Sequence, residues 1–279
     1  EGEGRDVLLL HGFPSNMYFW NDLKNDLKDY CRVTVVEQRG YPLSPIKNSI
    51  VSDFNIENLS LDIENLIRTL QLNNNLTIVG HDWGSIVAWS IASRNNVDIE
   101  KLISICGGTE FPSTSIYNNL LFDNGMHYIS SFQNPEKANK LIIKNLDLFF
   151  RSAYRITPKF DNDLIDLSLH SLFTTHNFKS KIHNIDIELL IKHFKHGMEQ
   201  PISWYSNIDF NLELSNQWRR KLDIKTIFLF GENDAAVKLN KKMIDRLKSS
   251  GTNVVVKEIK NADHWLPLTH RESVISEII

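Results

Sequence analysis

The segment that most constrains the fold is the pentapeptide from Gly80 to Gly84, which reads GHDWG and separates two apolar stretches. Residues 76–79 suit a buried strand, and residues 86–92 suit the helix that would follow. Small residues on both sides of a central polar residue permit a sharp strand-to-helix turn, because glycines let the backbones approach closely while the central side chain projects outward. The pattern therefore predicts a turn that presents Asp82 at the end of a buried strand.

A carboxylate in this position has a restricted chemistry. Attack by Asp82 on an acyl carbon would give a reactive anhydride, whereas attack on a saturated carbon gives an alkyl ester that water can hydrolyse afterwards. Epoxides and alkyl halides are substrates of this kind. The structural alternative is that Asp82 only caps the following helix, since acidic residues are common at helix N-termini.

Three further segments favour catalysis over capping. Residues 11–14 (HGFP) follow an apolar strand, and their loop can present a backbone N–H beside the turn. Asp234 closes a GEND segment that follows an apolar run, and His264 lies late in the chain in the segment NADHW. The chain order of nucleophile, acid and histidine is the one expected of an α/β-hydrolase triad.

Together, the motifs HGFP, GHDWG, GEND and DHW resemble the epoxide hydrolase branch of the α/β-hydrolase family, over essentially the whole chain. The resemblance implies an α/β fold with a mostly parallel central sheet, helices on both faces and an inserted helical cap. The sequence pattern agrees, because apolar strand-like segments alternate with helical ones in the first part of the chain. Over the whole chain, the strand-like segments are 7–10, 32–37, 76–80, 101–106, 225–230 and 253–259. One apolar helix face is marked by Leu59, Ile63, Leu66, Ile67 and Leu70.

This alternation lapses between about residues 112 and 222, where the sequence is helix-periodic and richer in aromatic residues. We expect an α/β-hydrolase core formed by residues 1–112 and 222–279, and a helical cap formed by residues 113–221. We expect the boundary at the entry to the cap to fall at Pro112.

Hydrolysis of an ester on Asp82 requires a base with a pKa near neutrality, and His264 is placed to serve. Asp234 would accept the other ring N–H of His264, fixing its tautomer and stabilising the imidazolium. Asp263 and Glu110 are alternatives for this orienting role. Glu110 is considered because some related dehalogenases place the acid after the preceding strand.

The main-chain N–H groups of Phe13 and Trp83 are expected to form the oxyanion hole, where negative charge develops as water attacks the ester. In the family, the peptide before the HGxP proline is often cis, so Phe13-Pro14 is a candidate. His11 is expected to brace this loop and to take no part in the chemistry.

Opening an epoxide releases a basic alkoxide, so the site should supply a proton, and tyrosine, with an ordinary pKa of about 10, suits this task. In the resembling epoxide hydrolases two cap tyrosines hold the epoxide oxygen. Tyr128 matches the first in the segment YISSFQ, and Tyr205 matches the second in the segment PISWY. The alternative is ordinary packing, with a buried ring and a solvated hydroxyl.

The closest rival is a haloalkane or haloacid dehalogenase, which also uses an Asp and His pair. Two departures favour epoxides: Phe13 occupies a position where haloalkane dehalogenases often carry an Asn donor, and Trp83 occupies one where fluoroacetate-type relatives carry Arg. A rival from another class is a non-catalytic binding protein on the hydrolase fold, because a fold alone does not define a function.

The charge and composition of the 279 residues bear on the partners, membrane association and metal binding of the protein. A net charge of −3 and scattered basic residues give no reason to expect nucleic acid as a partner. The apolar stretches are too short to span a bilayer. Cys31 and Cys106 are expected to be buried free thiols. His193 and His196 lie three residues apart, but no third ligand has suitable spacing, so we expect no metal.

We therefore expect no cofactor, and a small apolar epoxide as the partner molecule. The oligomeric state, monomer or homodimer, is left open, as are the identity and stereochemistry of the epoxide. We expect a cytoplasmic protein. Because the sequence starts without Met a few residues before a core strand, it is expected to be trimmed, which leaves a secreted or periplasmic location open.

Overall fold

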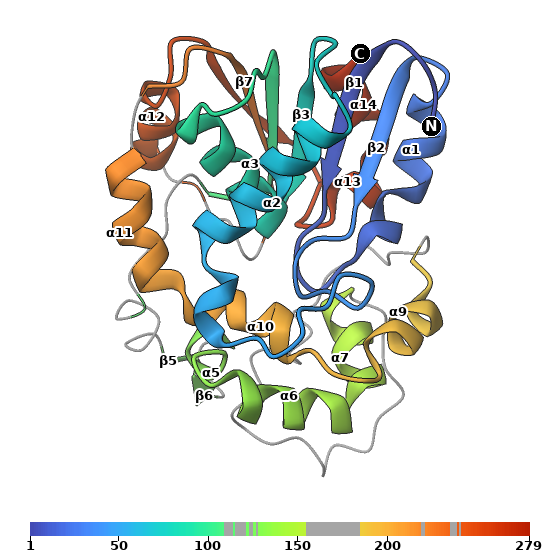
Figure 1. The fold of residues 1–279 in the computed structure, drawn as a ribbon, viewed down its shortest axis with the longest axis vertical. Helices are drawn as coiled ribbons and strands as arrows, with labels where there is room; N and C mark the ends of the chain where they lie inside the picture. Colours follow the sequence, from blue (N-terminus) through green and yellow to red (C-terminus); the bar gives the residue numbers. More distant parts are fainter. Residues whose placement is uncertain are drawn as a thin grey trace. The chain divides into compact units, whose positions relative to one another are not determined.

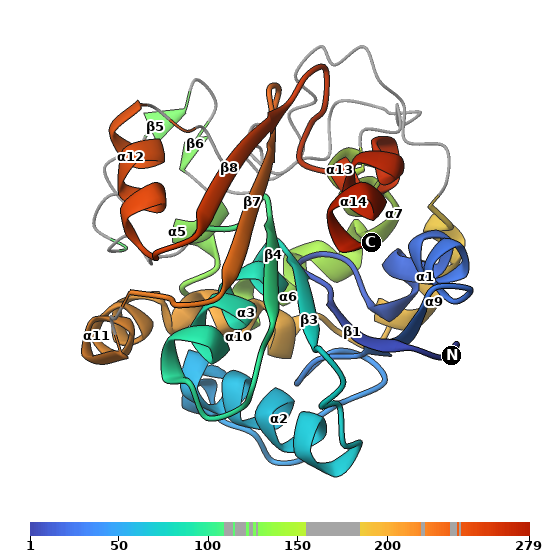
Figure 2. The ribbon, with the colours of Figure 1, turned by 90° about the horizontal axis from the view of Figure 1, so that it is seen from above.

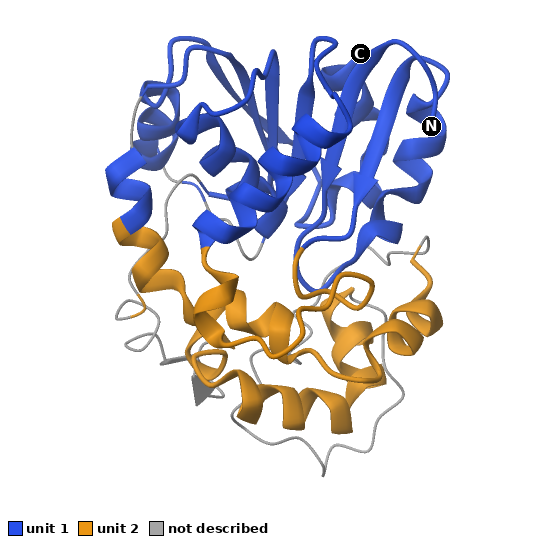
Figure 3. Cartoon of the chain, viewed as in Figure 1, with its two compact units in different colours: residues 1–38, 56–110, 214–279 blue, residues 39–55, 111–213 orange. Residues whose placement is uncertain are grey.

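The structure, a computed structural model, describes most of the chain (Figure 1). The described residues are 1–108, 114, 121–122, 125–126, 128–154, 185–218, 221–234, 239 and 241–279. The chain divides into two compact units (Figure 3). Unit 1 comprises residues 1–38, 56–110 and 214–279, and unit 2 comprises residues 39–55 and 111–213.

Unit 1 is built on a six-stranded sheet in the order β2-β1-β3-β4-β7-β8, and every neighbouring pair is parallel. The strands are β1 (Arg5–Leu10), β2 (Cys31–Val36), β3 (Thr77–His81), β4 (Lys101–Ile105), β7 (Lys225–Gly231) and β8 (Val254–Ile259). The central strands are buried on both faces, which explains their nearly continuous apolar sequences. The predicted strand segments and the parallel α/β architecture are confirmed.

Helices cover both faces of this sheet, as Figure 2 shows. One face carries α2 (Ile56–Thr69), α3 (Trp83–Arg94) and α12 (Lys241–Ser249), and the other carries α1 (Asn21–Leu27) and α14 (Arg271–Ile278). The short helices η1 (Met17–Trp20) and α13 (Leu266–Thr269) complete the described elements of this unit. Because all six strands run in parallel, their carboxyl ends lie at one edge of the sheet, where ligands bind in folds of this kind.

Among its described residues, unit 2 consists mainly of helices, together with a short antiparallel pair of strands. The elements are η2 (Val51–Phe54), β5 (Leu121–Phe122), β6 (Gly125–Met126), α5 (Tyr128–Ser131), α6 (Pro135–Lys144), α7 (Leu146–Ala153), α9 (Ile187–Phe194), α10 (Glu199–Ser206) and α11 (Ile208–Trp218), whose last turns count with unit 1. Residues 39–55 join this unit through α10. The indole N–H of Trp204 donates to the carbonyl of Arg39 at 3.1 Å, and the amide of Gln200 donates to the carbonyl of Ile46 at 2.7 Å.

Two details differ from the sequence-based expectation. Leu70 lies beyond the end of α2 and is 45 % exposed, so the buried face of that helix ends at Ile67. Residues 39–55 cluster with unit 2, although their position before α2 suggested the core. Whether residues 113–221 act as a cap over a catalytic site stays a proposal.

In the part of the chain that the structure describes, no helix is both long enough and apolar enough to cross a membrane. The cysteines Cys31 and Cys106 are both buried and free, as expected.

Candidate active site

The turn between β3 and α3 holds Asp82 in the backbone conformation φ 53°, ψ −120°. A non-glycine residue with positive φ is strained, and such residues persist where the surrounding structure holds them. The flanking glycines make the turn possible. A Cβ atom on Gly84 would lie 2.2 Å from the carbonyl oxygen of Leu10, and one on Gly80 would lie 2.3 Å from the carbonyl oxygen of Gly84. The side chain of Asp82 is 19 % exposed and forms no cap bond with the helix.

His264 lies between Asp82 and Asp234. Its Nδ1 lies 3.1 Å from both carboxylate oxygens of Asp234, and its Nε2 lies 3.6 Å from Oδ2 of Asp82. The Asp234 side chain is fully buried at the end of β7, whereas Asp82 and His264 retain partial exposure. The structure therefore brings together the three residues proposed as a triad, and it does so within unit 1.

Burial alone would lower the pKa of His264, but the charge and hydrogen bond of Asp234, with a further contribution from Asp82, raise it to about 10. The imidazolium form is therefore favoured at neutral pH while both carboxylates carry their charge. Removing the charge of Asp82 would remove one of the groups that raise this pKa.

Asp263 and Glu110 were the alternatives to Asp234 as the acid that orients His264. The carboxylate of Asp263 accepts the backbone N–H of Trp265 at 2.8 Å, so it supports the turn that carries His264. Glu110 lies outside the described residues. Asp234 is the residue whose carboxylate lies against Nδ1 of His264, on the side of the ring away from Asp82.

The loop after β1 places a backbone donor on the nucleophile. The N–H of Phe13 donates to Oδ1 of Asp82 at 2.8 Å, and the peptide between Phe13 and Pro14 is cis. A Cβ on Gly12 would lie 2.5 Å from the Cβ of Asp82, so this close approach requires glycine. Trp83 is the first residue of α3, a position whose N–H does not enter the i to i−4 ladder of its helix.

His11 is fully buried behind this loop. Its Nε2 accepts the backbone N–H of Gln38 at 3.2 Å, so the other nitrogen carries the proton and donates to the carbonyl of Gly12 at 3.1 Å. Burial lowers the pKa of His11 to about 4, which agrees with a neutral ring. These contacts fit the bracing role expected of His11.

Sequence reasoning missed His81, the residue before the nucleophile. Its Nε2 hydrogen-bonds to the carbonyl oxygen of His264 at 2.8 Å, and its ring stacks on Phe19 at a centroid distance of 4.9 Å. Burial, assisted by the charge of His264, lowers the pKa of His81 to about 4. A neutral His81 thus supports the backbone of His264. Its position in the GHDWG motif was visible in the sequence, but its partner lies 183 residues away.

Within unit 2, Tyr128 and Tyr205 lie next to each other. Their ring centroids are 5.9 Å apart in an edge-to-face arrangement, and Phe132 packs against both rings at 5.5 and 5.0 Å. The side-chain amide of Gln133 donates to the carbonyl of Tyr205 at 3.0 Å and so links α10 to the end of α5. Two tyrosines from segments 77 positions apart in the sequence therefore form one pair.

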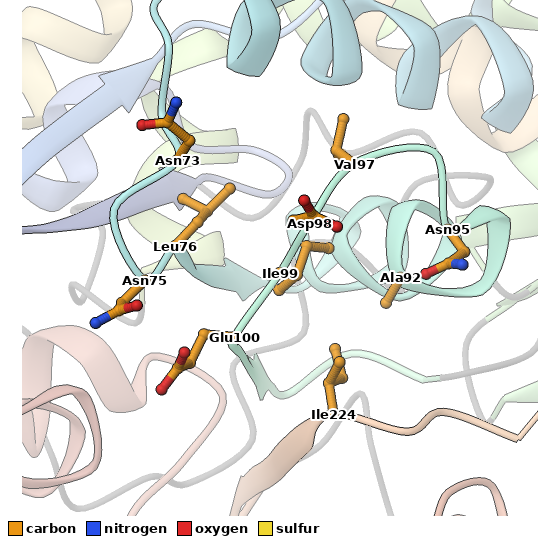
Figure 4. Close-up of a pocket in the computed structure, with 10 residues that line it drawn as sticks. All are labelled: Asn73, Asn75, Leu76, Ala92, Asn95, Val97, Asp98, Ile99, Glu100 and Ile224. Carbon is orange, nitrogen blue, oxygen red and sulfur yellow. The ribbon is translucent and has the colours of Figure 1, made fainter.

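Two other features of unit 1 could suggest a ligand. His81, Cys106 and His264 are buried with donor atoms within 4.8 Å of one another, but the Nδ1 of His264 already bonds to Asp234. The second feature is a pocket with a volume of about 290 Å³. Its lining residues are drawn in Figure 4. It is lined by Asn73, Asn75, Leu76, Ala92, Asn95, Val97, Asp98, Ile99, Glu100 and Ile224, some of which directly precede β3, β4 and β7. It therefore lies at the amino ends of the strands, and none of the predicted site residues lines it.

The chain belongs to the α/β hydrolase fold family, whose profile matches residues 7–271. It is 28 % identical to Epoxide hydrolase 1 of Caenorhabditis elegans, covering 98 % of this chain and 63 % of that protein. It is also 28 % identical to Epoxide hydrolase 2 of the same animal, covering 95 % of this chain and 70 % of the relative. A solved structure of a Vigna radiata epoxide hydrolase mutant matches with a TM-score of 0.84 at 22 % identity, over 100 % of this chain and 92 % of that one. The resemblance to the epoxide hydrolase branch is confirmed.

Proposed function

We propose that this protein is an epoxide hydrolase that converts small apolar epoxides to vicinal diols through a covalent ester on Asp82. The observation that carries the proposal is the carboxylate in the strained turn, with His264 Nε2 3.6 Å away and Asp234 holding the far side of that ring. The similarity to named epoxide hydrolases over nearly the whole chain supports the choice of substrate class.

In the first step, Oδ2 of Asp82 attacks a ring carbon and the carbon–oxygen bond of the epoxide breaks. The Oδ1 atom, which accepts the N–H of Phe13, becomes the carbonyl oxygen of the ester. Tyr128 and Tyr205 hold the departing oxygen, and one of them donates its proton to give a hydroxyl. Their adjacent rings in unit 2 support a shared role, because both hydroxyls must reach a single oxygen.

In the second step, neutral His264 takes a proton from water while the water oxygen attacks the ester carbonyl. Negative charge develops on Oδ1, where the N–H of Phe13, joined by that of Trp83, stabilises it. Collapse releases the diol oxygen, which takes the proton from the imidazolium of His264. The carboxyl proton left on Asp82 returns through solvent to the tyrosinate, so every group regains its starting state.

Ester hydrolysis should become faster as pH rises, because His264 acts only in its neutral form and its pKa is raised to about 10 in the resting protein. Esterification removes the charge of Asp82, so this pKa falls in the intermediate and the rate should level off below pH 10. This pH dependence is measured by following the decay of a preformed ester by intact mass at a series of pH values. Asp234→Asn removes the main group that raises the pKa of His264, so the rise of the hydrolysis rate with pH should occur at lower pH. A decay rate that falls with rising pH would contradict the role of His264.

The dehalogenase alternative is tested by direct comparison of products. We expect the protein to form diol from styrene oxide and to release no more halide from 1-bromobutane than a blank does. Faster halide release than opening of any epoxide in a panel would favour the dehalogenase, and failure to react with either class would favour a non-catalytic binding protein.

A further inference from the structure

The Gly12–Phe13 peptide is held at both of its edges. On one edge, the N–H of Phe13 points to Oδ1 of Asp82 at 2.8 Å. On the other edge, the carbonyl oxygen of Gly12 accepts the hydroxyl of Ser15 at 2.8 Å and the backbone N–H of Ser15 at 3.2 Å. The ring of His11 donates to the same oxygen at 3.1 Å.

These two edges belong to one rigid group. The peptide is planar and trans, so its C=O and N–H point in opposite directions, and the position of one fixes the direction of the other. Donors on the carbonyl oxygen also polarise the peptide, which makes its N–H a stronger donor. Ser15 and His11 are both fully buried, so water does not compete for these bonds.

A second set of contacts fixes His11 in turn. Its ring accepts the backbone N–H of Gln38, and the side-chain amide of Gln38 donates to the carbonyl of His11. Gln38 directly follows Glu37, which accepts the backbone N–H of Met17 at 2.7 Å. The chain after β2 thus holds both ends of the loop that carries Phe13.

We propose that Ser15 is a positioning residue for ester hydrolysis: its hydroxyl orients and polarises the Gly12–Phe13 peptide, so that the Phe13 N–H stabilises the charge that develops on Asp82 Oδ1. This inference rests on the proposed function. It predicts different effects on the two steps of the reaction, because the N–H of Phe13 also stabilises the charged carboxylate of Asp82 before alkylation. Weakening the donor should therefore slow hydrolysis of the ester without slowing its formation.

The test separates the two rate constants in Ser15→Ala by rapid mixing with styrene oxide and intact-mass measurement of the ester on Asp82. We expect ester decay to slow about fivefold to tenfold, a fraction of the ~10² to 10³ that loss of a whole oxyanion donor costs, and ester formation to stay within about twofold of the parent rate. Ser15→Cys keeps a group of similar size with a weaker donor, so its decay rate should lie between those of the parent and Ser15→Ala.

The matched control is Ser60→Ala in α2. Its hydroxyl is also fully buried and donates to a backbone carbonyl, that of Ile56, at 2.7 Å. This variant should lose a similar hydrogen bond and change neither rate constant. Three results would overturn the role of Ser15. Ser15→Ala could slow ester formation and ester decay equally, or it could leave decay unchanged. Alternatively, the decay rate of Ser15→Cys could fall outside the range between those of the parent and Ser15→Ala. A parent protein that forms no ester at all would instead overturn the proposed function, and this inference with it.

Discussion

Replacing His264 with glutamine is expected to convert the protein from a catalyst into one that reacts once and stops. Asp82 can still be alkylated, because the first step does not need a base at His264, but water is no longer activated for the second. We expect turnover to fall by about 10² to 10⁴, the usual contribution of a general base. After addition of styrene oxide, intact mass should show the gain of one epoxide per chain, and peptide mapping should place it on Asp82.

Two controls sharpen this experiment. His270→Gln changes another histidine of the same C-terminal segment, outside the triad, and should turn over normally without accumulating ester. His264→Gln combined with Asp82→Asn should gain no mass. An adduct on another residue, or no adduct with epoxides that the parent hydrolyses, would refute the covalent mechanism.

Removal of both tyrosine hydroxyls should have the second large effect. Each single change, Tyr128→Phe or Tyr205→Phe, keeps the ring in its packing with Phe132 and removes one donor. Loss of one such donor typically costs about 10² to 10³ in rate, and the surviving hydroxyl should offset part of that in the single variants. The double variant should therefore be slowed much more than either single variant, and in ester formation specifically. The rate of ester formation in each variant can be measured by stopped flow.

An ester already formed should decay at nearly the parent rate in the double variant, because the step that uses His264 and Asp234 does not involve the tyrosines. Tyr154→Phe provides the matched control, since Tyr154 is a buried tyrosine of the same unit outside the predicted pair. If the double variant opened epoxides as fast as the parent, the tyrosines would have no role in the reaction.

The sheet could be predicted because its strands are buried on both faces and therefore read as short apolar runs between turn residues. Long-range packing was harder to predict. Leu70 continues the apolar spacing of α2, yet it lies past the end of the helix and is exposed. Residues 39–55 join unit 2 through hydrogen bonds to Gln200 and Trp204. These partners lie 154 and 165 positions later in the chain, so no local sequence pattern reveals them.

In the site, too, some residues could be predicted from the sequence and others depended on long-range packing. Asp82, Asp234 and His264 could be proposed because each follows a strand and has the side chain that its chemistry needs. The choice of Asp234 over Asp263 depended on which carboxylate faces the ring, a matter of geometry. Ser15 and Gln38 carried no signal of their own, because they act on the loop through backbone atoms that no sequence pattern records.

The central claim, that Asp82 is the nucleophile and water attacks its ester, is tested most directly by following oxygen through a single turnover. With excess protein in heavy-oxygen water, one turnover of styrene oxide should place the heavy oxygen in the carboxylate of Asp82 and give diol that is largely unlabelled. Mass spectrometry of the diol and of the peptide that contains Asp82 measures both. Label in the diol of the first turnover, with none on Asp82, would contradict the account, because water would then have attacked the epoxide directly.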